Sequence, residues 1–248
     1  MASSTDIIAN TWSEFLEGVK EAKNELGNPS EVWYRGHSRL RYVLIPTLFR
    51  YSSGLIKEQE LFNDYARFSA RLLPSRLNDW ERLFDMQHYG IPTRLLDWTE
   101  VLGVAVAFAL YDSREEKEDT AIFVLNPALL NSKSGRAEIR QAPADPTFDY
   151  KAMYWYGNPV TPNYPIAFRP ILQNDRLVAQ QGTFTIHGSN PQALDEQASN
   201  CVRRVIISSK AKQGAREFLE MAALDPWRIY PDMVGMARHL VRKHLEES

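Results

Sequence analysis

Residues 85–111 carry the strongest pattern in the chain and read DMQHYGIPTRLLDWTEVLGVAVAFALY. The first half is crowded with polar side chains, and the second half is an apolar run of small residues without proline. We interpret it as a polar turn, forced by Gly90 and Pro92, that leads into a buried helix capped by Asp97 or Thr99. Polar turns on a rigid scaffold often carry binding and catalytic residues, so we expect a functional site here.

Strand and helix patterns lie on both sides of this stretch. Runs of β-branched and aromatic residues predict strands at 32–34, 121–125 and 201–207, and a pair of short strands around the Gln-Gln-Gly turn within 176–186. Apolar residues at helical spacing predict helices at 5–26, 57–71, 78–86, 215–224 and 233–244. The proline-rich segment 131–170 predicts long loops with short helices, as in a lid or partner surface.

We expect a single domain over residues 1–248 with an α+β fold. Its core would be a mixed, mainly antiparallel sheet flanked by helices, with an N-terminal helix at 5–26 and a C-terminal helical element at 215–245. The composition is that of an ordinary globular protein, with 44% hydrophobic and 24% charged residues.

Several classes of protein are disfavoured by composition. The net charge of -2 argues against a general polyanion-binding surface, although it leaves room for a local basic cleft. The single cysteine, Cys201, excludes an internal disulfide and a cysteine-built zinc site, and the five histidines show no zinc-ligand spacing, so we expect no metal. No apolar run approaches the roughly 20 residues that cross a bilayer, and the N-terminus does not resemble a secretory signal. We therefore expect a cytoplasmic protein without membrane contact.

Three separated blocks of polar residues lie at strand ends or turns: Arg35-Gly36, residues 88–99 and residues 180–184. We expect them to converge on one cleft. Other interpretations remain open for each block. Arg35 could be a surface residue, His88 could be a core histidine, and Gln180 and Gln181 could be turn residues that hydrogen-bond their own backbone. Asp97 and Arg94 could form a structural ion pair. No phosphate-binding loop, dinucleotide fingerprint or G-x-S-x-G motif indicates a particular reaction.

The residues also resemble a known family. The segments that carry the resemblance are WYRGHS (33–38), LIPTLFR (44–50), QHYGIPTRLLDWT (87–99) with AVAFA (105–109), AQQGTF (179–184) and YPDMVGMARHL (230–240). Together they resemble the FRG domain family over most of residues 30–240. The occurrence of that family in bacteria and phages implies a role in conflict or defence.

The order of the three blocks is also similar to that in ADP-ribosyltransferases, which implies NAD as a substrate. Arg35 would match the residue on the first strand, Thr99 would precede the helix, and Gln180 or Gln181 would fall near the late strand. The resemblance implies binding of NAD by six residues, namely Arg35, Gly36, Tyr89, Arg94, Thr99 and Gln180. It implies catalytic roles for His88, Asp97 and Gln181.

The sequence departs from that pattern, because a glutamine stands where ADP-ribosyltransferases have a glutamate. Glutamine can hydrogen-bond a ribose hydroxyl but cannot act as a base or stabilise a cation by charge. Our first hypothesis is an enzyme that transfers ADP-ribose from NAD to an unknown protein or nucleic-acid acceptor. The second is a noncatalytic module that binds a nucleotide, nucleic acid or protein. The third is a hydrolase or nuclease that uses His88 and Asp97.

Overall fold

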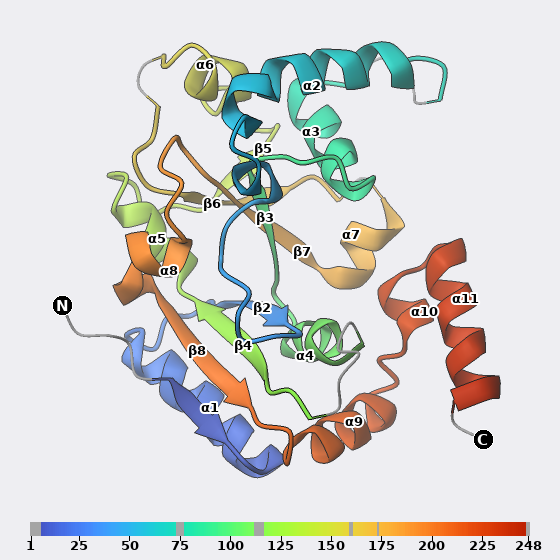
Figure 1. Cartoon of the computed structure of the whole chain (residues 1–248). Helices are drawn as coiled ribbons and strands as arrows, with labels where there is room; N and C mark the ends of the chain where they lie inside the picture. The colour runs from blue at the N-terminus through green and yellow to red at the C-terminus, as the bar shows by residue number, and fades with distance from the viewer. Residues whose placement is uncertain (1–5, 73–76, 112–116, 159–160, 173, 247–248) are drawn as a thin grey trace.

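The computed structural model describes residues 6–72, 77–111, 117–158, 161–172 and 174–246. Within these ranges, one sheet of eight strands has the order β1-β8-β4-β2-β3-β7-β6-β5 (Figure 1). Neighbouring strands are antiparallel except for the two edge pairs, β1 with β8 and β5 with β6. The expected α+β fold with a mixed, mainly antiparallel sheet is confirmed.

The strands are β1 (Ile7–Ala9), β2 (Trp33–His37), β3 (Leu95–Thr99), β4 (Thr120–Leu125), β5 (Arg140–Ala142), β6 (Ile166–Pro170), β7 (Gly182–Ile186) and β8 (Val202–Ile207). The helices are α1 (Trp12–Glu25), α2 (Gly54–Ser69), α3 (Asp79–His88), α4 (Leu102–Tyr111), α5 (Pro127–Ser132), α6 (Tyr150–Tyr154), α7 (Asp175–Gln180), α8 (Leu194–Gln197), α9 (Lys212–Met221), α10 (Pro226–Ile229) and α11 (Met233–Val241). Short helical turns form η1 (Thr47–Arg50), η2 (Ser199–Cys201) and η3 (Arg242–Glu246). No helix in the described ranges combines the length and apolar character needed to cross a membrane.

The sheet is weakly joined at its centre. In the described chain, β2 and β3 are paired at the single position Tyr34–Thr99. By contrast, β2 pairs with β4 at five positions, and β3 pairs with β7 at five positions. The sheet therefore consists of two halves that meet at one residue pair and diverge beyond it.

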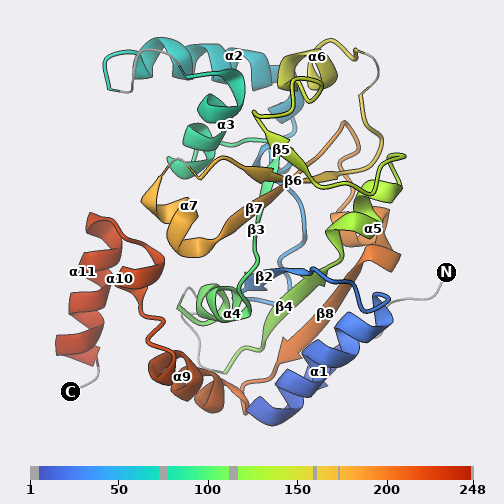
Figure 2. The same cartoon turned by 180° about the vertical axis from the view of Figure 1, so that it is seen from behind.

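Separate helical layers cover the two halves. Helices α1, α4 and α9 pack on the half that contains β4 and β8, in a core that includes Phe15, Val106 and Val205. Helices α2, α3 and α6 pack on the half that contains β6 and β7, where Trp80 and Phe168 lie. Figures 1 and 2 show these two layers at opposite ends of the molecule. The point where β2 and β3 diverge lies between these two layers.

Helix α4 lies directly on β2 because Gly36 has no side chain. A Cβ atom at Gly36 would come within 2.0 Å of the Ala105 carbonyl oxygen and 2.8 Å of the Ala109 amide nitrogen. Both contacts are with the backbone of α4, where small residues face the strand. The prediction that the small residues of this helix allow it to approach the sheet closely is confirmed.

The structure corrects the expected N-terminal helix. Residues 7–9 form the edge strand β1, which pairs in parallel with β8 at Ile7–Val205, and the helix begins at Trp12. Thr11, rather than Thr5 or Asp6, is its N-cap, because the Thr11 hydroxyl accepts a hydrogen bond from the Glu14 amide. Two β-branched isoleucines at a free sheet edge favour the strand. Residue 5 lies outside the described ranges.

The structure also differs from the sequence-based predictions in three other places: residues 175–180, the segment between the polar turn and α4, and residues 131–170. Residues 175–180 form helix α7 rather than a strand, with Asn174 as N-cap and Gln181 as a C-cap in the left-handed conformation at φ 42°. Strand β3 separates the polar turn from α4, so the turn does not lead straight into the helix. Residues 131–170 contain the short helices that were expected but also β5 and β6. Short strands without alternating polarity are hard to distinguish from loops.

A buried ion pair just before β3 joins α2, the start of α6 and the residues that follow β7. The Arg94 Nε atom donates to Glu58 Oε1 at 2.6 Å, and a second bond joins its Nη2 atom to Glu58 Oε2. Arg94 also donates to the His187 and Gly188 carbonyl oxygens, each at 2.9 Å. Tyr150 donates to Glu58 at 2.7 Å. Both charged side chains are almost fully buried, so each charge is stabilised by the other rather than by water.

We expect Glu58→Gln to lower the free energy of unfolding by about 3–5 kcal/mol, because the buried Arg94 would lose its counter-charge. The matched control is Glu60→Gln, which removes the exposed partner of Lys57 and should cost at most about 1 kcal/mol. Urea denaturation of the three proteins measures both values. Equal stability of Glu58→Gln and Glu60→Gln would contradict the role of the buried pair.

We expect Gly36→Ala to lower the free energy of unfolding by about 1–3 kcal/mol, because the new methyl group would push α4 away from β2. Gly182→Ala is the matched control in strand β7 of the same sheet, since its Cβ would meet the movable Leu177 Cδ2 atom at 3.0 Å. Thermal or urea unfolding should rank the control as the more stable variant. The reverse order would show that α4 does not rest on the Gly36 backbone.

Candidate functional site

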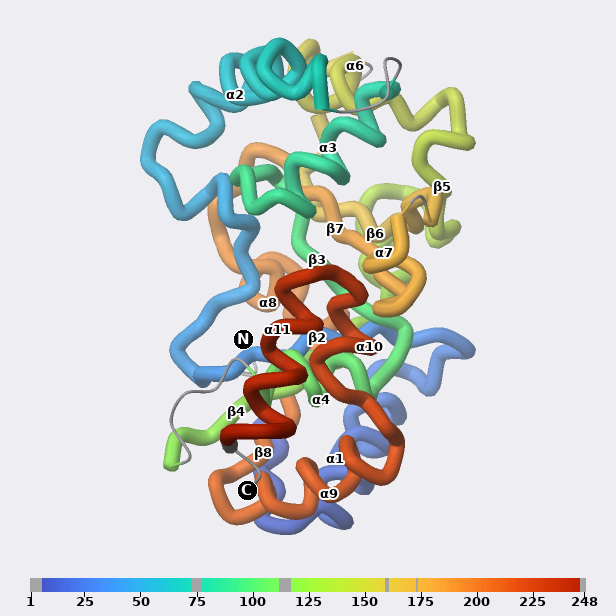
Figure 3. Tube along the Cα trace, turned by 90° about the vertical axis from the view of Figure 1, so that its right-hand side faces the viewer, coloured from blue at the N-terminus to red at the C-terminus, as the bar shows by residue number. Residues whose placement is uncertain are grey.

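A cleft of about 260 Å³ lies between the two helical layers, where β2 and β3 diverge. Its walls come from β2, β3 and β7 of the sheet, and from helices α3, α4 and α7. Tyr230, which follows α10, also lines it. Seen from the side in Figure 3, α10 and α11 lie in front of the region where β2, β3 and α4 meet. Segments distant in sequence therefore meet at this cleft.

Arg35 bridges the gap between β2 and β3. Its Nη1 atom donates to the Asp97 carbonyl oxygen at 2.6 Å and lies 3.6 Å from the Asp97 Oδ2 atom. Its Nε atom donates to His37 Nε2 at 3.1 Å. The guanidinium thus replaces a ladder hydrogen bond that the diverging strands do not make. Burial lowers the pKa of Arg35 from its usual value, and the carboxylate of Asp97 opposes that change.

His37 is held as a neutral imidazole with a defined tautomer. Arginine has no acceptor atom, so His37 Nε2 must accept from Arg35, and the proton must reside on Nδ1. Nδ1 then donates to the Tyr42 carbonyl oxygen at 3.2 Å. Burial lowers the pKa of His37 to about 3, with a further contribution from the positive charge of Arg35. The ring therefore stays uncharged at neutral pH.

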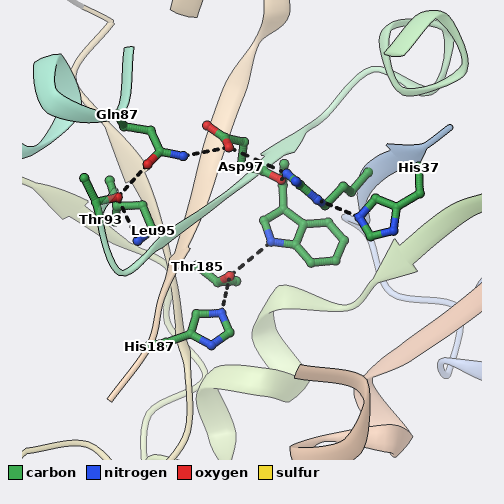
Figure 4. A network of polar contacts seen from close by, with 9 residues as sticks. His37, Gln87, Thr93, Leu95, Asp97, Thr185 and His187 are labelled. Carbon is green, nitrogen blue, oxygen red and sulfur yellow. Dashed lines mark hydrogen bonds and ion pairs between the residues drawn. The ribbon is translucent and has the colours of Figure 1, made fainter. Parts of the chain in front are cut away.

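The Asp97 side chain is oriented from the opposite wall. Gln87 Nε2 donates to Asp97 Oδ2 at 2.8 Å, and Gln87 Oε1 accepts from the Thr93 hydroxyl at 2.5 Å. The Thr93 hydroxyl in turn accepts from the Leu95 amide at 3.1 Å. Figure 4 shows this chain of contacts running from Thr93 through Gln87 to Asp97. The carboxylate is fixed in position, yet about half of the side chain (53%) is exposed.

A second polar network lies on the other face of the sheet. Trp98 Nε1 donates to the Thr185 hydroxyl at 3.1 Å, and that hydroxyl lies 3.3 Å from His187 Nε2 (Figure 4). His187 is fully buried, and burial lowers its pKa to about 3. Its Nδ1 atom has no hydrogen-bond partner among the described residues. This network supports β3 from behind the cleft.

Six of the nine residues singled out in the sequence line the cleft, namely Arg35, Gly36, His88, Asp97, Thr99 and Gln180. Asp97 is paired with Arg35 and Gln87, and not with Arg94 as one interpretation of the sequence had it. The Thr99 hydroxyl is occupied, because it donates to the Gln180 carbonyl oxygen at 2.6 Å and accepts from the Val101 amide at 3.0 Å. The Gln180 side chain donates to the Ile229 carbonyl oxygen at 3.0 Å, which ties α7 to α10.

The other three residues lie outside the cleft lining. The Arg94 side chain is buried in its ion pair with Glu58. Tyr89 is 62% exposed, and its ring packs edge-on against His88. Gln181 is an exposed C-cap residue whose carbonyl oxygen accepts from the Glu100 amide. Roles for these three residues in ligand binding or catalysis stay predictions.

The structure adds residues that the sequence did not single out. Arg176, in the first turn of α7, places its guanidinium 4.9 Å from the centre of the Tyr230 ring. Phe108 of α4 meets the same ring edge-on at 5.6 Å. Burial lowers the pKa of His88, and the charge of Arg176 lowers it further. Tyr230 opens the C-terminal motif 230–240, so that motif was the available signal, whereas Arg176 carries no local signature.

The charges in the cleft favour an anionic or polar ligand over a metal ion. Arg35 and Arg176 contribute two guanidinium groups, and Asp97 contributes the single carboxylate among the described lining residues. No group of three or more histidine, cysteine, aspartate or glutamate side chains in the described ranges is arranged to hold a metal. Six aromatic residues line the cleft together with these charges, namely Tyr34, Phe84, Trp98, Phe108, Phe184 and Tyr230.

We expect the free energy of unfolding to decrease as the pH is lowered from about 6.5 to about 3. In that range His37 binds a proton in the unfolded chain but not in the folded chain, where its pKa is about 3. One such proton contributes a slope of up to about 1.4 kcal/mol per pH unit in that window and none above it. His37→Asn keeps a donor and an acceptor but cannot be protonated, so its slope should be shallower. Urea titrations at several pH values measure this, and identical slopes would refute a buried neutral His37.

Comparison with known proteins places one part of this site in a family. Residues 30–118 match the family model of the FRG domain. No curated protein and no solved structure matches the chain. The matched segment supplies β2, α3, β3 and α4, and with them Arg35, His88, Asp97 and Thr99 of the cleft. The wall that contains Arg176, Gln180 and Tyr230 lies beyond the match. The chain therefore contains an FRG domain at residues 30–118.

Proposed function

We propose that the cleft binds NAD and that the chain is an ADP-ribosyltransferase-like enzyme. The observation that carries the proposal is the meeting of Arg35, Asp97, Thr99 and Gln180 from distant segments in one cleft. This arrangement fits the order of site residues implied by the resemblance to ADP-ribosyltransferases. A pocket with a few convergent polar groups among aromatic walls is also the general form of a cofactor site.

The cleft suits a nucleotide in charge and in size. Two donors are available to a diphosphate. One is the guanidinium of Arg176, and the other is the Nη2 atom of Arg35, which forms no hydrogen bond within the described chain. Tyr34, Phe84 and Tyr230 supply apolar faces for a planar ring. A volume of about 260 Å³ falls just below the usual range for ligand pockets, which begins at roughly 300 Å³. The cleft would therefore enclose one nucleoside half of NAD and leave the other half at its mouth.

In the proposed reaction the bond between the ribose C1′ atom and nicotinamide breaks, and nicotinamide leaves with the electron pair. The ribose acquires positive charge, which the Asp97 carboxylate would stabilise by charge. A nucleophilic atom of the acceptor, a protein or a nucleic acid, forms the new bond to C1′ and loses its proton. His88 is uncharged at neutral pH, because burial and Arg176 lower its pKa, and it could accept that proton. A role in conflict between bacteria and phages is the setting that the family resemblance implies.

A noncatalytic nucleotide-binding module is the second candidate, and a specific observation favours it. The described lining of the cleft contains no glutamate, and Arg35 already uses its Nε and Nη1 atoms for contacts within the protein. Such a site would bind NAD without breaking it. The nuclease or hydrolase hypothesis has less support, because no hydrogen bond between His88 and Asp97 and no metal-ligand cluster occur in the described ranges.

Isothermal titration with NAD and an assay of nicotinamide release test both candidates. We expect Arg35→Ala and Arg176→Ala each to weaken NAD binding by at least about tenfold, since each removes a charged donor. Asp97→Asn should bind NAD nearly as well as the parent but release nicotinamide about 100-fold more slowly. Arg41→Ala, at an exposed arginine outside the cleft lining, is the control.

Two outcomes of these assays would decide between the enzyme and the binding module, or reject both. Binding of NAD without nicotinamide release, unchanged in Asp97→Asn, would establish the binding module and reject the enzyme. Absence of NAD binding to the parent protein would reject both. Circular dichroism of each variant is needed beside these assays, because Arg35 also joins the two halves of the sheet.

A further inference from the structure

A second cavity, of about 550 Å³, lies outside the cleft and is larger. It is bordered by the end of α5, residues 133–138, β5, α6 and residues 161–164. The two cavities have no lining residue in common. Figures 1 and 2 agree in placing α5 on the side of the molecule opposite α10 and α11. A ligand in this cavity would therefore not compete with one in the cleft.

Hydrogen bonds hold the walls of this cavity in place. The buried Asn131 amide donates to the carbonyl oxygens of Glu138 and Ala167, each at 2.9 Å, and accepts from the Ala167 amide at 2.7 Å. It thus ties the segment 133–138 to β6. On the other side, the Thr161 hydroxyl donates to the Met153 carbonyl oxygen at 3.0 Å. The cavity is therefore bounded by anchored segments on both sides.

The rim of the cavity carries an excess of positive charge. Lys133, Arg136 and Arg140 line it, together with one carboxylate, Glu138. Arg140 is partly neutralised, because its Nε atom donates to Asp145 Oδ2 at 2.6 Å. Within the described ranges, Lys133 and Arg136 form no ion pair with an acidic side chain. Lys133 and Arg136 are thus two cations at the rim beside the one carboxylate of Glu138, and neither is engaged in an ion pair within that part of the chain.

Apolar surface lies beside these charges. The Lys133 ammonium is 5.4 Å from the centre of the Tyr164 ring, so that ring and the cation form one face. Met153 and Ile166 contribute aliphatic surface to the same cavity. A cationic rim next to an aromatic and aliphatic wall matches a molecule with one charged end and one flat or apolar end.

We propose that this cavity is a second ligand site, which binds a small organic anion. Its phosphate or carboxylate group contacts Lys133 and Arg136, and its flat body lies against Tyr164 and Ile166. Both kinds of anionic group satisfy the same donors, and the choice between them is a matter for the experiment. The proposal does not depend on what the cleft between β2 and β3 binds.

Titration calorimetry with three probes tests the proposal: AMP, which joins a phosphate to a flat base; benzoate, which joins a carboxylate to a ring; and inorganic phosphate, which has no body. We expect AMP or benzoate to bind the parent protein more tightly than inorganic phosphate does, and the tighter of the two identifies the preferred anionic group. Lys133→Glu should weaken that binding by at least about tenfold. The matched control, Lys210→Glu, makes the same charge change at an exposed lysine outside this cavity and should bind as the parent does.

The cleft variant Arg35→Ala separates the two sites. Binding in the second cavity should be unchanged in Arg35→Ala and weakened in Lys133→Glu. The opposite result, loss in Arg35→Ala with full binding in Lys133→Glu, would place the probe in the cleft and overturn the proposal. Failure of both AMP and benzoate to bind the parent protein would also overturn it, whatever the result with NAD.

Discussion

The guanidinium of Arg35 holds together a sheet that its own strands do not close. Beyond the pair Tyr34–Thr99, β2 and β3 diverge, and the Asp97 carbonyl oxygen accepts from Arg35 instead of from a strand. Burying a charge is costly, and here the Asp97 carboxylate and the neutral His37 ring offset that cost. The cleft exists because the strands part, and the strands can part because this side chain satisfies the exposed backbone oxygen.

Three successive residues of β2 serve this junction in different ways. Arg35 and His37 point to one face and form the hydrogen-bonded bridge, whereas Gly36 faces α4 and lets it rest on the strand. That close contact places Phe108 of α4 where it meets Tyr230, so the position of the helix also sets the outer wall of the cleft. The tripeptide therefore links the packing of the core to the shape of the site.

Local patterns predicted the parts of this structure that depend on local chemistry. The helix expected at 78–86 is present as α3, for which Asn78 is the N-cap, and the expected buried strand at 121–125 forms most of β4. The pattern failed at residues 7–9 and 175–180, where pairing with β8 and capping by Asn174 decide the conformation. It also could not choose the partner of Asp97, because Arg35 is 62 residues away in the chain and Arg94 only three. Long-range contacts of this kind leave no periodic signal.

The contacts of Arg35 limit what it can offer a ligand, and this bears on how the site is divided. Two of its donor atoms are committed to the protein, which leaves Nη2 as the atom for a ligand. The second cation, Arg176, comes from α7 and is stacked on Tyr230, and none of its contacts within the described ranges joins β2 to β3. In the proposed nucleotide site, ligand affinity would depend on both arginines, whereas the junction of the two sheet halves depends on Arg35. Changes at Arg176 can alter binding while the junction of the two halves remains intact.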